Sequence, residues 1–166
     1  TGSIAAQGAI TQASTFDGGT GRIEITGTAA QTFTGSATTS AGTLPDIEID
    51  KASGTLTLSG TIRTTNDWTW TAGTVDATTN DTTVVFGTTS LTITGTHTLD
   101  NVHFNSDGGD TYTIANSNTL TVAGTLTLTD GQINQTTIPA TGSIAAQGNI
   151  TQASTFDTGT ARIEIN

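Results

Sequence analysis

The chain has 166 residues, about a quarter of them Thr, and fourteen carboxylates against four Lys and Arg give a formal net charge of -10. A nucleic-acid partner needs a basic surface that releases counterions from phosphates, and anionic membranes attract polybasic segments, so this charge argues against both. No Cys is present, which excludes disulfides, thiolate nucleophiles and Cys-ligated metals, and no stretch reaches the about 20 apolar residues of a membrane span.

Short strands are predicted along nearly every segment of the chain. Apolar residues alternate with Thr through GTLTLSGTI (54–62), LTITGTHTL (91–99) and TYTIANSNTLTVAGTLTLTDG (111–131), with Gly, Asn and Asp at the breaks. Period-two alternation bounded by turn residues is typical of strands, and β-branched side chains suit it. No stretch keeps a helical period of 3.6, so we expect no helix.

The end of the chain repeats its beginning. Residues 141–165 differ from residues 1–25 only at Asn149, Thr158 and Ala161, which replace Ala9, Gly18 and Gly21. The repeat of 1–26 at 141–166 gives a period of 140 residues. Weaker sub-repeats lie near 22–82 and 83–162, the second made longer by the segment 135–149. We interpret the chain, which has no initiator Met or signal peptide, as an internal segment of a longer periodic architecture.

Two all-β folds fit this pattern. Tandem immunoglobulin-like β-sandwiches are the alternative, but they need a thick core of bulky apolar residues, which short strands with single Leu, Ile, Val or Phe residues do not supply. A parallel β-solenoid needs only a few apolar residues per coil. We therefore predict one continuous solenoid over residues 1–166, with coils of about 20 residues. About seven coils would fill one period and advance about 33 Å.

The run WTAGTVDATTNDTTVVFGTTSLTITGTHTLDNVHFNSDGG (70–109), followed by TLTVAGTLTLTDGQIN (119–134), resembles the Thr/Gly/Asn-rich repeats of large bacterial secreted and cell-surface β-solenoid proteins, the adhesin-like and autotransporter-like group. The resemblance implies stalks, adhesins or surface filaments, and it carries over no catalytic residue. The segment 135–149 departs from the pattern.

Three carboxylates are the candidate metal ligands. Asp46, Glu48 and Asp50 share one strand face, and Ca²⁺ prefers such oxygen ligands. A solvated outer face is the simpler interpretation. The stretch NSDGGD (105–110) is interpreted as an ordinary turn, because the nonapeptide of calcium-binding solenoids does not recur.

The sequence contains little that supports a catalytic function. His97 and His103 lie six residues apart without a third ligand, which does not make a zinc site, and no nucleophile elbow is present. A β-helix that cleaves polysaccharides would need carboxylates and basic residues clustered in a groove. We therefore expect no enzyme, no cofactor and no catalytic residue.

Other surface functions remain open. Trp68 and Trp70 share a strand face and would form a lateral or glycan contact unless they pack inside the solenoid. Flat Thr arrays on solenoids can bind ice. Thr-x-Thr pairs occur here at 55/57, 92/94, 111/113, 119/121 and 125/127, but their spacing is irregular. Asn80, Asn134 and Asn149 begin glycosylation acceptor patterns.

The expected function is that of a non-enzymatic extracellular structural repeat forming a filament, stalk or sheath by coil stacking. Its partners would be further repeats of the same chain, or other copies docked end to end through unpaired strands. An adhesin or glycan-binding surface module is the alternative.

Overall fold

All regular structure in the described part of the chain is β-strand. The computed structural model describes residues 2–135 and 141–166. These residues form seventeen strands, of which β5 is the longest with 19 residues. The strands are β1 Ser3–Ala6, β2 Ile10–Gln12, β3 Arg22–Ile25, β4 Gln31–Ser36, β5 Asp46–Thr64, β6 Trp68–Asp76, β7 Thr83–Phe86, β8 Leu91–Thr94, β9 His97–Leu99, β10 Asn101–Asn105, β11 Thr111–Ile114, β12 Thr119–Val122, β13 Leu126–Asp130, β14 Gln132–Gln135, β15 Ser143–Ala146, β16 Ile150–Gln152 and β17 Arg162–Ile165.

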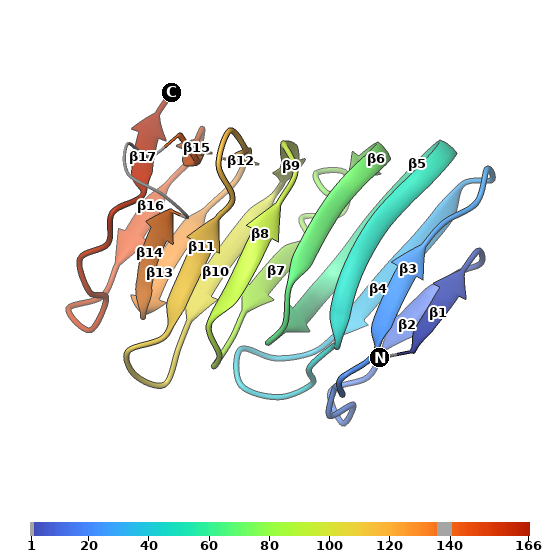
Figure 1. Cartoon of the computed structure of the whole chain (residues 1–166), viewed down its shortest axis with the longest axis horizontal. Coiled ribbons are helices and arrows are strands. Elements are labelled where there is room, and N and C mark those ends of the chain that lie inside the picture. The colour runs from blue at the N-terminus through green and yellow to red at the C-terminus, as the bar shows by residue number, and fades with distance from the viewer. Residues whose placement is uncertain (1, 136–140) are drawn as a thin grey trace.

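The strands stack into a parallel β-solenoid. Every pairing between the described strands is parallel, and each links segments about one coil apart, as in β1 with β3 and β3 with β5. Figure 1 shows the strands side by side, with the two chain ends at opposite ends of the stack. The described residues make about seven turns, with about 22 residues per turn. The predicted fold is confirmed, and immunoglobulin-like sandwiches are excluded because their sheets are antiparallel.

The repeated segment returns after six coils. The strand pairings place Ile4, Ile23, Ile47, Trp68 and Ile93 at equivalent positions of five successive coils. Strand β9 follows β8 in the same coil and continues through β12 to β15, the second copy of β1. The coils are therefore somewhat longer than the expected 20 residues, and one period holds six of them. With parallel strands about 4.8 Å apart, a period advances about 29 Å.

The segment 135–149 does not interrupt the solenoid where it is described. Residues 136–140 lie outside the described residues. From Ser143 the chain forms β15, which pairs in regular register with Thr119 on one side and Arg162 on the other. Residues 143–149 thus belong to an ordinary coil.

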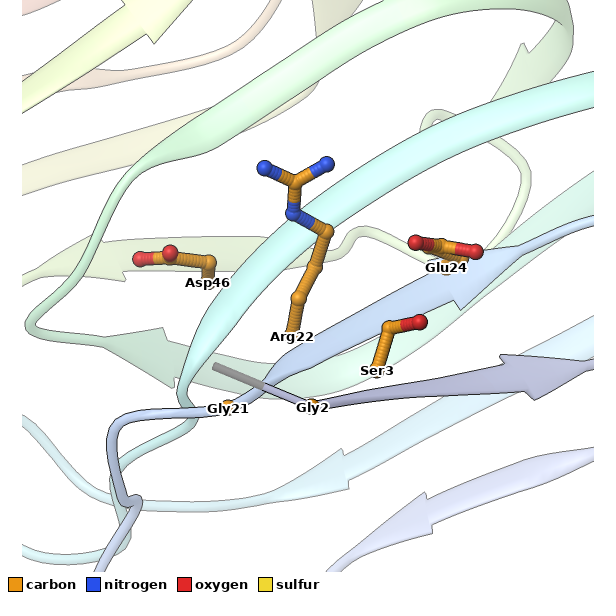
Figure 2. A pocket seen from close by; sticks show the side chains of 6 residues that line it. All are labelled: Gly2, Ser3, Gly21, Arg22, Glu24 and Asp46. Carbon is orange, nitrogen blue, oxygen red and sulfur yellow. The ribbon is translucent and has the colours of Figure 1, made fainter.

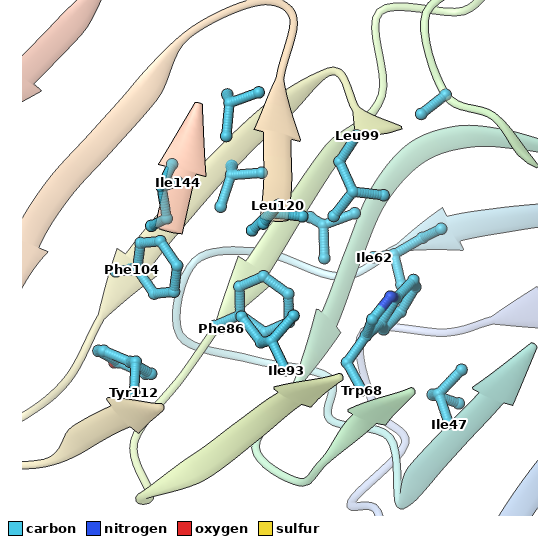
Figure 3. Packing of buried hydrophobic residues seen from close by; sticks show 14 of the residues in the cluster. Ile47, Ile62, Trp68, Phe86, Ile93, Leu99, Phe104, Tyr112, Leu120 and Ile144 are labelled. Atoms are coloured by element: carbon cyan, nitrogen blue, oxygen red, sulfur yellow. The ribbon is translucent and has the colours of Figure 1, made fainter. Parts of the chain in front are cut away.

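The core is a narrow column of inward-facing side chains. Along β11 and β12 each apolar residue is buried and each Thr lies outward, so strand alternation separates core from surface. Aromatic rings stack through the coils: Phe104 lies 5.3 Å from Phe86 and 4.8 Å from Tyr112 between ring centroids, and Trp68 meets Phe86 edge-on at 6.1 Å. Figure 3 shows these rings amid the aliphatic side chains. Each fully buried large side chain stabilises the fold by about 1.5–3 kcal/mol.

Glycine allows two backbone segments to approach closely where β4 meets β5. Gly35 and Gly60 pair in register on β4 and β5. Gly60 has a φ of +72°, and a Cβ there would lie 2.3 Å from the carbonyl oxygen of Gly35. Only glycine meets both requirements, because other residues avoid positive φ and need room for a Cβ.

Candidate functional site

The three predicted carboxylates lie on the outer face of β5, with Ile47 and Ile49 buried on the other side. Glu48 accepts a hydrogen bond from Arg22 Nη1 at 2.5 Å and another from the Thr71 hydroxyl at 3.2 Å. Asp46 accepts one from the backbone N–H of Asp67 at 3.3 Å. Two of the three carboxylates are therefore engaged by protein donors.

No metal-binding cluster forms around these carboxylates. Residues 2–135 and 141–166 contain no group of three or more His, Asp or Glu side chains able to hold a metal ion. Asp50 is exposed at the end of this row. The arrangement is that of a solvated, partly ion-paired outer face.

A shallow polar depression lies next to this face. It has a volume of about 230 Å³ and is lined by Ser3, Arg22, Glu24 and Asp46 together with two glycines. Figure 2 shows the Arg22 side chain between the two carboxylates. The depression combines acidic and basic groups, but Arg22 is paired with Glu48, outside this lining. It lies over β1, β3 and the start of β5, at the N-terminal end of the solenoid.

A second depression at the same end is apolar. Its volume is about 200 Å³, and Ile4, Phe16, Ile23 and Pro45 supply most of its apolar lining. Ile4 is 69% exposed and Phe16 is 45% exposed. The end coil thus presents apolar side chains to solvent.

The two tryptophans do not form a shared surface platform. Trp68 is fully buried, and its Nε1 donates a hydrogen bond to Nε2 of His97 at 3.1 Å. Trp70 is half-buried, donates to the carbonyl oxygen of Gly73 at 3.0 Å, and stacks on the His97 ring. Trp68 therefore packs inside the solenoid, the alternative to a surface contact, and only Trp70 keeps part of its side chain accessible.

Both histidines are engaged by the protein. Because Nε2 of His97 accepts from Trp68, its Nδ1 carries the proton and donates to the carbonyl oxygen of Gly95 at 2.9 Å. Burial lowers the pKa of His97. His103 lies on β10, is half-buried with its Nε2 2.7 Å from the Thr129 hydroxyl, and burial also lowers its pKa. The two rings belong to different strands and form no common site.

The stretch 105–110 forms a self-contained turn. The Ser106 hydroxyl donates to Asp110 at 2.8 Å and accepts from the backbone N–H of Gly108 at 3.0 Å. Gly109 adopts a φ of +65°. The turn's polar groups satisfy one another, as expected for a Gly/Asp turn.

The predicted Thr pairs do not make a continuous ladder. Thr113 pairs with Thr92 on one side but with Asn134 on the other. Thr121 pairs with Thr98 and Ala145. Such interruptions break the flat, regular Thr array that an ice-binding face would require.

The three candidate glycosylation sites differ in accessibility. Asn80 is exposed and donates to the carbonyl oxygen of Leu58 at 3.0 Å, and Asn149 is exposed. Asn134 is half-buried and accepts from the backbone N–H of Thr160 at 2.9 Å. The Thr of its acceptor pattern, residue 136, lies outside the described residues.

Buried polar side chains, which the sequence did not single out, join different coils: Lys51 reaches the preceding coil, and Gln12 reaches a coil two further on. Lys51 is 1% exposed, and its Nζ donates to the carbonyl oxygen of Ala29 at 3.0 Å and to Oε1 of Gln31. Gln12 makes two hydrogen bonds with the backbone of Arg63, at 2.8 and 3.1 Å. The one sequence feature that could have pointed to Gln12 is the repeat, in which Gln12 recurs as Gln152.

The repeated segment has opposite environments at the two ends of the solenoid. We call residues 2–25, which carry β1 to β3, the leading segment, and residues 142–165, which carry β15 to β17, the trailing segment. Ile25 is fully buried, whereas its counterpart Ile165 is 78% exposed. Conversely, Ile144 is fully buried, whereas its counterpart Ile4 is exposed.

The difference follows from strand neighbours. Strand β3 lies between β1 and β5, but β17 pairs only with β15 among the described strands. Strand β15 lies between β12 and β17, but β1 pairs only with β3 within the same residues. One sequence is therefore compatible with neighbours on both sides, and each end lacks one of them.

Comparison with known proteins identifies no relative: no family model, no curated protein and no solved structure matches the chain. Among the described residues, no helix has the length and apolar character needed to cross a membrane.

Proposed function

We propose that the chain is a non-enzymatic, extracellular structural repeat that forms a filament, stalk or sheath by stacking of coils. The observation that carries this proposal is the repeated segment at both ends of the solenoid. Ile25 and Ile144, which have neighbouring coils on both sides, are fully buried, whereas their counterparts Ile165 and Ile4 at the open ends are 78% and 69% exposed. Further 140-residue periods would bury them at every junction.

The physical basis is the pairing of open strand edges. An unpaired edge offers a row of backbone N–H and C=O groups to another strand. In the middle of the solenoid these groups pair with the next coil, and apolar side chains continue the core column. A filament of this kind extends without any new type of contact.

The surface composition suits an exposed fibre. The outer positions are rich in Thr and acidic residues, and the net charge of -10 keeps such a surface soluble. The extracellular placement rests on this composition and on the resemblance to secreted bacterial β-solenoid repeats.

A tandem protein tests the structural role. Residues 27–166 are appended once and then twice to the full chain, and particle lengths are measured by electron microscopy. We expect straight rods that lengthen by about 29 Å per added period, because each period supplies six coils. Flexibly linked beads would contradict the proposal.

Localisation needs a separate experiment. An antibody raised against the folded chain is applied to intact cells of the source organism and to permeabilised cells. We expect labelling of intact cells. Labelling that requires permeabilisation would contradict the extracellular role.

A further inference from the structure

We propose that the trailing segment of one chain replaces the leading segment of a second copy, so that chains join end to end by exchanging one coil. This inference rests on the proposed structural role and adds the partner and its contact surface. The partner is a second copy of the same chain, and the surface is the edge formed by β4 and β5, which the leading segment covers.

The leading segment covers this edge with two strands. On β2, Ile10 pairs with Phe33 and Gln12 with Gly35. All four residues of β3 pair with the first four residues of β5, from Arg22 with Asp46 to Ile25 with Ile49. The trailing segment has the same residue type at every paired position of both strands.

Further contacts across the edge, from side chains and from backbone, use the same repeated residues. Arg22 pairs with Glu48, and Gln12 bonds to the Arg63 backbone. The backbone N–H of Thr43 donates to the carbonyl oxygen of Phe16 at 2.7 Å. The counterparts in the trailing segment are Arg162, Gln152 and Phe156.

In the trailing segment these groups are available. Ile163 is 36% exposed, and Gln152 is exposed, whereas Gln12 is 2% exposed. Arg162 pairs at 2.5 Å with Glu164 on its own strand, where both side chains remain accessible. The trailing segment therefore carries an unused copy of the surface that binds β4 and β5.

One difference favours the chain's own leading segment. Gly18 has a φ of +75°, and a Cβ there would lie 3.2 Å from Cγ2 of Thr43. Its counterpart is Thr158, a β-branched residue that avoids positive φ. The leading segment is also tethered, which gives it a high effective concentration at the edge. Exchange should therefore increase when the leading segment is weakened or when Thr158 is replaced by Gly.

Disulfide trapping between chains tests the exchange. The chain has no Cys, so Asp46→Cys with Arg162→Cys introduces the only thiols. Exchange would place these positions opposite each other on neighbouring chains, as Arg22 and Asp46 are now. Within one chain the two positions lie five coils apart, about 24 Å, which is far beyond disulfide reach. Cross-linked oligomers thus report exchange.

Two variants of this double-cysteine chain are compared under mild oxidation at one protein concentration. Ile23→Ser with Ile25→Ser weakens the leading segment, and we expect at least a tenfold rise in cross-linked oligomers. Thr158→Gly leaves the leading segment intact and should also raise cross-linking. Failure of both variants to raise it would overturn the proposal.

A matched control removes the incoming surface. Ile163→Ser with Ile165→Ser, added to the weakened chain, should abolish the cross-links while leaving the fold unchanged, because both side chains are exposed in the single chain. Persistent cross-links would show contact by another route and overturn the proposal. Tandem rods that lengthen without any cross-linking of single chains would refute coil exchange and leave the structural role standing.

Discussion

The indole nitrogen of Trp68 donates a hydrogen bond to Nε2 of His97 across 3.1 Å, although the two residues are 29 positions apart. Both side chains are buried between adjacent coils, and Nδ1 of His97 is committed to the carbonyl oxygen of Gly95. Protonation would place a second N–H against the indole N–H. The neutral imidazole is therefore part of the folded core.

Acid should destabilise the solenoid through His97. Burial lowers its folded pKa below the unfolded value of about 6.5, so the unfolded chain binds more protons over this range. The free energy of unfolding should fall as pH decreases from 7.5 to 5.5. Urea denaturation at several pH values measures this. His97→Gln retains an acceptor for Trp68 and should flatten the dependence, leaving the contribution of His103, whose pKa is also lowered. An unchanged pH dependence in His97→Gln would contradict the assignment.

Alkali should act through Tyr112, the only tyrosine in the chain. Burial raises the pKa of its phenol, and Asp110 adds to the effect. Because the unfolded phenol titrates near 10, the unfolded state loses its proton first, and stability should fall as pH rises through about 10.

Absorbance near 295 nm follows this single phenol. We expect the phenolate signal to appear together with loss of the β-sheet circular dichroism signal. A native protein that ionises near pH 10 without unfolding would refute the burial argument. Tyr112→Phe removes the signal and serves as the optical control.

The Gly60 position should tolerate no side chain. Gly60→Ala combines positive φ with a Cβ 2.3 Å from a backbone oxygen, whereas Gly109→Ala has a φ of +65° and no atom within 4 Å of the Cβ. The strained backbone alone costs about 1–2 kcal/mol, and the clash at Gly60 should add about 1–3 kcal/mol. Chemical denaturation of both variants measures the difference. Equal losses would show that the close approach to Gly35 has no energetic consequence.

The aromatic column should dominate core stability. Phe104 lies between Phe86 and Tyr112, so Phe104→Ala should lower the free energy of unfolding by about 3–5 kcal/mol. Thr98→Ala, at an exposed position of β9, should change it by less than about 0.5 kcal/mol. Similar effects of the two substitutions in urea denaturation would mean that the column is not a packed core.

The parallel solenoid could be predicted from the sequence because the patterns that indicate it are local. Thr alternating with Leu or Val at positions such as 120–122 sets the strand faces, and single apolar residues per strand suffice only when coils stack. Coil length was underestimated, because it depends on corners and long strands such as β5, which continues through Lys51 and Gly54 instead of breaking at the turn-like sequence.

The contacts between coils could not be predicted in the same way. The alternation pattern alone does not say whether Trp68 faces the core or the surface. Its buried position depends on His97, its hydrogen-bond partner one coil later. Lys51 is buried because Gln31 and Ala29 supply acceptors from the preceding coil, which residue type alone does not indicate. Pairing across about 20 residues is set by three-dimensional register.

Cryo-electron microscopy of the native material tests whether the parallel solenoid is continuous and extends by whole periods. We predict an axial reflection at about 4.8 Å together with a longer repeat near 29 Å, six coil spacings. Particles spaced at domain-sized intervals without the axial reflection would contradict a continuous solenoid.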